Sequence, residues 1–62
     1  MTDDFAGLAA PARRALAGAG VGSLAELARR READVAALHG MGPNALRLLR
    51  EKLAAQGLRF AA

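Results

Sequence analysis

The sequence predicts an all-α domain, a compact bundle of four to five short helices. Strong helix formers dominate the composition, and the only β-branched residues are Thr2, Val21 and Val35. Glycine and proline divide the chain into short segments with helical spacing. With 62 residues and no cysteine, we expect residues 1–62 to form a single domain held together by helix packing rather than by disulfides.

The first helix is expected at residues 11–17, after a lead-in of residues 1–9 that contains Gly7. Pro11 suits the first turn of a helix, where its missing N–H is not needed. Gly18 or Gly20 then ends the helix, because glycine commonly follows a helix C-terminus.

The second helix opens at a capping box formed by Ser23 and Glu26. The Ser23 hydroxyl is expected to accept from the backbone N–H of Glu26, whose side chain reaches back. Glu26 and Arg30 form an i, i+4 pair. We expect this helix to end within the arginine run at residues 29–31, where positive charge is favourable at a helix C-terminus.

Two further helices are predicted at residues 32–38 and at about 43–56, with Gly57 as the final stop. Glu32 and Asp34 place acidic groups in the first turn of the shorter one, which suits its dipole. The spacing of leucines in the last helix places one apolar stripe towards the core. Leu48 lies on the opposite side of that stripe and is either a single exposed leucine or a partner contact.

The expected core consists of the large apolar residues on the inner helix faces, together with a hydrophobic C-terminal segment that folds back. Its members are Leu8, Leu16, Val21, Leu24, Leu27, Val35, Leu38, Met41, Leu46, Leu49, Leu53, Leu58 and Phe60.

Charge and composition narrow the function classes. Nine basic residues stand against six acidic ones, a net charge of +3, which favours a polyanionic partner or serves only solubility. The N-terminus does not resemble a signal peptide, and no run of apolar residues is long enough to span a membrane, so we expect a cytoplasmic protein. His39 is the only histidine and lacks catalytic or metal-binding companions, so we expect neither an enzyme nor a cofactor.

The most informative segment is the turn Leu38-His-Gly-Met-Gly-Pro-Asn44, which joins the last two helices. Glycines at 40 and 42 permit positive φ and leave the backbone accessible to a ligand. Met41 is expected to point inward and anchor the turn. The N–H groups of Gly42, Asn44 and Ala45 then lie at a helix N-terminus, which is a natural site for a phosphate. The alternative is that both glycines simply turn the chain.

This turn resembles a helix-hairpin-helix motif, whose pattern is apolar-x-x-Gly-apolar-Gly, over roughly residues 32–53. The resemblance implies a grip on the nucleic-acid backbone beside the minor groove, without sequence reading. From about Leu8 to Phe60 the chain also resembles the C-terminal domain of the bacterial RNA polymerase alpha subunit and small stand-alone bacterial DNA-binding proteins of that SAM-domain-like fold. The runs Pro-Ala-Arg-Arg-Ala-Leu and Gly-Val-Gly-Ser-Leu-Ala-Glu-Leu carry this likeness together with the glycine turn.

The resemblance is carried over residue by residue. The polymerase domain uses an arginine and an asparagine in the minor groove, and these positions fall on Pro11 and Arg14. Its phosphate-holding glycine is kept as Gly42, while its lysine and serine positions are Asn44 and Ala45. The chain thus keeps the hairpin glycine but lacks that domain's groove arginine, lysine and serine.

The leading hypothesis is a small module that binds duplex DNA through the phosphate backbone and minor groove, largely without sequence specificity, with a link to transcription. The candidate DNA-binding residues are Arg13, Arg14, Gly40, Gly42, Asn44, Ala45 and Arg47. Arg13 and Arg14 are expected to replace the missing groove arginine. The alternative is a protein-interaction module of the same fold that docks on a transcription or repair protein.

Overall fold

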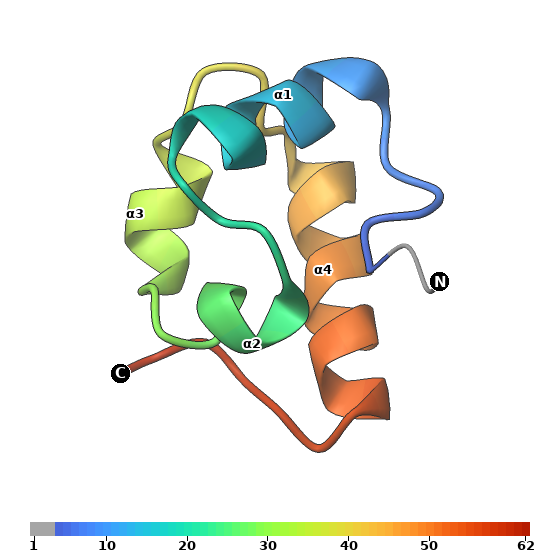
Figure 1. The fold of residues 1–62 in the computed structure, drawn as a ribbon, viewed down its shortest axis with the longest axis vertical. Helices are drawn as coiled ribbons and strands as arrows, with labels where there is room; N and C mark the ends of the chain where they lie inside the picture. The colour runs from blue at the N-terminus through green and yellow to red at the C-terminus, as the bar shows by residue number, and fades with distance from the viewer. Residues whose placement is uncertain (1–3) are drawn as a thin grey trace.

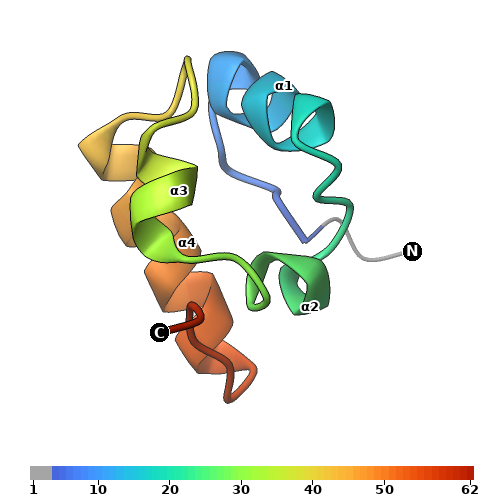
Figure 2. The ribbon, with the colours of Figure 1, turned by 90° about the vertical axis from the view of Figure 1, so that its left-hand side faces the viewer.

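The chain forms four helices, and a computed structural model describes residues 4–62. They are α1 (Ala10–Gly18), α2 (Leu24–Leu27), α3 (Glu32–Ala36) and α4 (Pro43–Ala55). No residue between 4 and 62 belongs to a β-strand, and one isolated bridge pairs Arg31 with Ala61. The all-α prediction is confirmed. Helix α1 and the turn between α3 and α4 lie at one end of the molecule, and the C-terminal segment lies at the other (Figures 1 and 2).

Helices α1 and α4 end in the same way. Gly20 (φ 79°) follows α1 and Gly57 (φ 72°) follows α4, and both adopt the left-handed backbone that glycine tolerates. The N–H of Val21 donates to Leu16 O at 2.9 Å, and the N–H of Leu58 donates to Leu53 O at 2.8 Å. These are Schellman bonds. Gly57 ends α4 as predicted, and of the two predicted stops for α1 it is Gly20, because Gly18 lies inside a helix that is one residue longer at each end than expected.

Helix α2 begins at the predicted capping box but ends early. Glu26 N–H donates to Ser23 Oγ at 3.2 Å, whereas the Glu26 carboxylate accepts from Gly22 N–H at 2.6 Å, one residue before the cap. The helix stops at Leu27, so the prediction that it ends within residues 29–31 was wrong. Residues 28–30 form a turn, because Arg29 and Arg30 N–H bond to the carbonyls three residues earlier.

Arg30 therefore has a different role from the one predicted. Its Nη2 donates to Ala19 O at 3.1 Å, so this guanidinium stabilises the C-terminus of α1 rather than that of its own helix. Glu26 is engaged with Gly22 N–H instead of pairing with Arg30. The turn after Leu27 rotates Arg30 away from the face of α2 that an i, i+4 pair requires.

The core lies between all four helices. Its buried members are Leu8, Ala12, Leu16, Val21, Leu24, Leu27, Val35, Leu49 and Leu53. The other predicted core residues pack against it while half-buried: Leu38, Met41, Leu46, Leu58 and Phe60. Ala12, only 1% exposed, was not predicted, since alanine carries little apolar signal in a sequence pattern. Its small side chain allows close helix packing.

Leu48 corrects a prediction. The leucine expected on the outer face of the last helix is half-buried and packs against the core. A Cβ placed on Gly7 would lie 3.7 Å from Leu48 Cδ2, so the N-terminal segment covers this side of α4. Helical periodicity could not reveal that cover, because the segment before α1 has no regular structure of its own.

The C-terminal segment folds back as predicted. Ala61 N–H donates to Arg30 O at 2.9 Å, beside the bridge between Arg31 and Ala61. Leu58 and Phe60 pack against the core from this segment. Across residues 4–62, no helix has the length and apolar character needed to cross a membrane.

Candidate nucleic-acid interface

The turn between α3 and α4 packs tightly against the start of α1. Gly40 has φ 93°, and a Cβ built on it would lie 2.8 Å from Pro11 O and 3.2 Å from Pro11 C. Two independent constraints therefore require glycine here: the left-handed backbone and the contact with another backbone segment. Met41 packs on the core beneath the turn, and its N–H donates to Leu38 O at 3.1 Å, so it anchors the turn as expected.

Gly42 differs from Gly40 in both respects. It is the N-cap residue of α4, with an extended backbone (φ −103°, ψ 173°) that any residue can adopt. A Cβ at this position would meet nothing within 4 Å. The expectation that glycine is needed for positive φ therefore holds for Gly40 alone, and the fold does not require glycine at 42.

The start of α4 has uncapped N–H groups. The first bond of the helix runs from Leu46 N–H to Gly42 O at 3.1 Å. Among residues 4–62, the N–H groups of Gly42, Asn44 and Ala45 have no hydrogen-bond acceptor, and no side chain caps the helix. Asn44 is exposed, whereas Gly42 and Ala45 are half-buried. These donors and the positive end of the dipole coincide, which favours an anion.

The start of α1 also lacks a side-chain cap and lies beside it, but it offers fewer donors. Pro11 has no N–H and Ala12 N–H donates to Ala9 O at 3.1 Å, so within the part of the chain that the structure describes Ala10 has the free N–H among its first three helical residues. Its N-cap is Ala9, which provides no side-chain acceptor, and Pro11 occupies its first turn. Gly40 connects the two starts through its contact with Pro11. Both helices are described in full, and neither has an acidic residue in its first turn. We call these two starts, residues 9–12 and 42–45, the bare edge.

A shallow hollow joins the bare edge to the middle of α4. Its lining residues come from the N-terminal segment and from one face of α4: Gly7, Leu8, Ala9, Asn44, Ala45, Arg47, Leu48 and Glu51. Three predicted site residues, Asn44, Ala45 and Arg47, are thus brought together. Glu51 also borders the hollow, on the side away from the N-terminus of α4.

Arg13 and Arg14 take a different position. Both are exposed on α1 and line a second hollow with Phe5, Ala17, Val21 and Gly22, at the connection from α1 to α2. Arg14 lies one turn after Pro11, so its long side chain starts close to the bare edge. Of the predicted cations, Arg47 lines the hollow at the bare edge, whereas Arg13 and Arg14 line the hollow at the connection from α1 to α2.

The described acidic groups are mostly engaged away from the bare edge. Asp4 accepts from Leu24 N–H at 3.0 Å, and Glu26 accepts from Gly22 N–H, so both serve the start of α2. Glu32 forms an ion pair with Arg50. Because these three carboxylates bind other groups, backbone dipoles and arginines determine the electrostatic potential at the bare edge.

Sequence reasoning assigned Pro11, Arg13 and Arg14 to this region through the resemblance, but it missed the uncapped start of α1 as a binding feature. A proline-led helix with no acid in its first turn and no polar N-cap was the available signal. Its position beside α4 depends on the contact between Gly40 and Pro11, which is long-range. His39 is exposed in the turn next to Gly40.

Comparison with known proteins found no match to this chain among protein-family models, curated proteins or solved structures.

Proposed function

We propose that this domain binds duplex DNA through the phosphate backbone, with the bare edge as its contact surface. The observation that carries the proposal is the juxtaposition of two uncapped helix starts, without an acidic residue in either first turn. Backbone N–H groups of Gly42, Asn44 and Ala45 donate to phosphate oxygens, and the helix dipole favours the negative charge. Binding by these groups carries no sequence information.

Exposed cations beside the bare edge supply the remaining affinity. Arg47 extends from the same helix as the uncapped N–H groups, and Arg14 from the helix beside them. Each contact with a phosphate releases condensed counterions, so the affinity falls steeply with salt. Asn44 adds a neutral hydrogen-bond donor where a lysine would add charge.

The proposal includes membership of the helix-hairpin-helix class and a transcription-related role, as in the polymerase domain that the sequence resembles. Pro11 stands at the position of that domain's groove arginine. Backbone binding with little sequence preference is therefore the mode that these residues support. In this mode Arg14, which lies one turn further along α1, replaces that arginine in the minor groove.

A substitution that stabilises the fold but repels an anionic ligand tests this function. Gly42→Asp places a carboxylate at the N-cap of α4, where aspartate accepts from backbone N–H groups and is favoured by the dipole. We expect unchanged or slightly higher thermal stability. The same carboxylate competes with phosphate, so we expect binding to a short duplex to weaken about tenfold or more. Fluorescence anisotropy at low salt measures the affinity.

Ala25→Asp is the matched control. Ala25 is exposed in the first turn of α2, so the variant has the same net charge and a carboxylate at a different helix start. We expect it to bind DNA nearly as the unaltered protein does. Equal loss of affinity in both variants would show that the effect comes from net charge alone. Wild-type affinity of Gly42→Asp for DNA would contradict the proposed binding site.

One observation that favoured the alternative, a protein-interaction module, does not hold in the structure. It drew on an exposed Leu48, and that side chain is half-buried beneath the N-terminal segment. Support for such a role comes instead from the hollow beside the C-terminal segment.

A further inference from the structure

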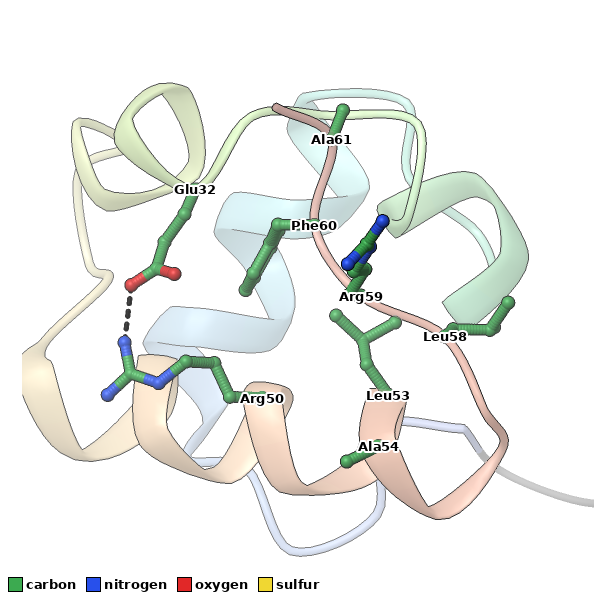
Figure 3. Close-up of a pocket in the computed structure, with 8 residues that line it drawn as sticks. All are labelled: Glu32, Arg50, Leu53, Ala54, Leu58, Arg59, Phe60 and Ala61. Atoms are coloured by element: carbon green, nitrogen blue, oxygen red, sulfur yellow. Dashed lines mark hydrogen bonds and ion pairs between the residues drawn. The ribbon is translucent and has the colours of Figure 1, made fainter.

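An apolar hollow lies at the end of the molecule opposite the bare edge. It has a volume of about 360 Å³ and is open to solvent between α4, the start of α3 and the C-terminal segment (Figure 3). Its apolar lining consists of Leu53 and Ala54 from α4 and of Leu58, Phe60 and Ala61 from the segment that folds back. The Phe60 ring points from this segment towards α4 (Figure 3). A volume of this size accommodates a large side chain.

The walls of the hollow are held by backbone hydrogen bonds. Leu58 N–H donates to Leu53 O at 2.8 Å, and Ala61 N–H donates to Arg30 O at 2.9 Å. The segment between these bonds is therefore fixed at both ends, one to α4 and one to the turn before α3. Phe60 lies between them and packs against the core. The hollow is thus a preformed feature of the fold, and a ligand would not have to order it.

One wall of the hollow carries positive charge. Arg59 is exposed on its wall, and among the described residues it has no acidic partner. Arg50 and Glu32, which are 50% and 41% exposed, form an ion pair at the opposite wall, so they contribute no net charge. Arg29 and Arg31 are exposed on either side of Arg30, whose carbonyl holds Ala61. The surroundings therefore complement a negatively charged partner with an apolar group.

We propose that this hollow binds an acidic segment of a partner protein, which inserts one large apolar side chain and places a neighbouring carboxylate on Arg59. The apolar side chain contacts Leu53, Ala54 and Phe60, as anchor residues do at the centre of protein interfaces. The guanidinium of Arg59 can bind a carboxylate in a bidentate manner. This binding surface does not depend on the proposed DNA site, because the two lie at opposite ends of the molecule (Figures 1 and 2).

Three synthetic peptides test the proposal by nuclear magnetic resonance with the full ¹⁵N-labelled chain. The first has one phenylalanine flanked by glutamates, the second replaces that phenylalanine with alanine, and the third replaces the glutamates with lysines. We expect the first to shift the amides of Ala54, Arg59 and Phe60 at up to millimolar concentration. We expect the second to bind about tenfold more weakly, the effect of losing one buried apolar side chain, and the third not to bind.

Two exposed alanines at the end of α4 give a matched pair of variants. Ala54 lines the hollow, whereas its neighbour Ala55 does not. Ala54→Glu places a negative charge in the binding surface, so we expect it to abolish the shifts caused by the first peptide. Ala55→Glu makes the same change of net charge and should leave binding within about twofold of wild type. At the wall, Arg59→Ala should weaken binding, and Arg59→Lys should restore part of it.

Several outcomes would overturn the proposal. These are no shift with the first peptide, equal shifts with the first and second peptides, or equal loss in Ala54→Glu and Ala55→Glu. Shifts of the same amides on dilution without peptide would assign the hollow to a second copy of this chain. Shifts there with a short duplex, and none with the peptide, would assign it to nucleic acid. Loss of duplex binding in Gly42→Asp, with peptide binding intact, separates the two sites.

Discussion

The four helix starts fall into two pairs, one with acidic side chains at its free N–H groups and one without. Helix α2 is capped by Ser23 and receives the carboxylates of Asp4 and Glu26 at its start. Helix α3 has no side-chain cap, but it carries Glu32 and Asp34 in its first turn. Helices α1 and α4 begin with proline in the first turn and with alanine or glycine at the N-cap, and no acidic residue follows. Carboxylates therefore complement the dipole at one pair only.

Capped and uncapped helix starts have different consequences, the first for the stability of the domain and the second for ligand binding. A capped start satisfies its own donors and contributes to the stability of the domain. An uncapped start leaves donors and positive dipole ends unneutralised by the protein, which makes it the better site for an external anion. The starts of α1 and α4, which lack both a side-chain cap and an acidic residue, are adjacent because Gly40 contacts Pro11, so their effects combine at one edge.

The largest expected effect concerns the contact that joins the two uncapped starts. Gly40→Ala must adopt φ near 93° and would place its Cβ 2.8 Å from Pro11 O. We expect a loss of about 2–4 kcal/mol in the free energy of unfolding, from backbone strain and overpacking. Gly42→Ala, with an extended backbone and open space, should lose less than about 1 kcal/mol. Urea unfolding measures both, and equal losses would contradict the assigned roles of the two glycines.

The next effect concerns the cations beside the uncapped starts. Arg47→Ala removes one predicted phosphate contact, so the slope of log affinity against log salt should become shallower by about 0.9. Arg29→Ala changes the net charge equally at the turn after α2 and should leave the slope unchanged. Duplex binding by anisotropy over a range of salt concentrations gives both slopes. A matching change in Arg29→Ala would show that the contact surface is not confined to the bare edge.

Helix α2, whose start is capped by a side chain, offers the complementary test. Ser23→Ala removes the hydroxyl that accepts from Glu26 N–H, and we expect a loss of about 1 kcal/mol of stability, typical of an N-cap. DNA affinity should not change, because α2 contributes no free donors to the proposed surface. Thermal unfolding and anisotropy on the same variant check the two statements. Weaker DNA binding by the folded variant would show that the start of α2 also contributes to DNA binding, which contradicts the distinction between the two pairs of helix starts.

The smallest expected effect concerns the ion pair at the start of α3. Arg50 and Glu32 are both substantially exposed, so solvent screens their attraction and Arg50→Ala should cost at most about 0.5 kcal/mol. The difference from wild type should shrink further in high salt, as urea unfolding at two salt concentrations can show. A large, salt-independent loss would mean that packing of the Arg50 side chain matters more than its charge.

Local signals in the sequence predicted the parts of the fold that depend on neighbouring residues. The Ser23 cap, the stops at Gly20 and Gly57, and the turn around Gly40 each follow from the chemistry of a few adjacent positions. The all-α composition and the leucine spacing were sufficient for most of the core.

Long-range contacts account for what the sequence did not predict. Arg30 reaches the carbonyl of Ala19, and Leu48 is covered by the segment that contains Gly7. Neither partner is identifiable from helical periodicity. The candidate site shows the same limit: Asn44, Ala45 and Arg47 follow from the glycine turn, and the resemblance points to the first helix, but the contact between Gly40 and Pro11 follows only from the fold.

A titration of the ¹⁵N-labelled protein with a short duplex, followed by nuclear magnetic resonance, tests the central claim most directly. Free backbone donors that gain a phosphate change their amide shifts, whereas donors already bonded to side chains do not. We expect the largest shifts at Gly42, Asn44, Ala45 and Ala10, and little change at Leu24 and Glu26. Larger shifts at the start of α2 than at the starts of α1 and α4, or none at any helix start, would contradict the account.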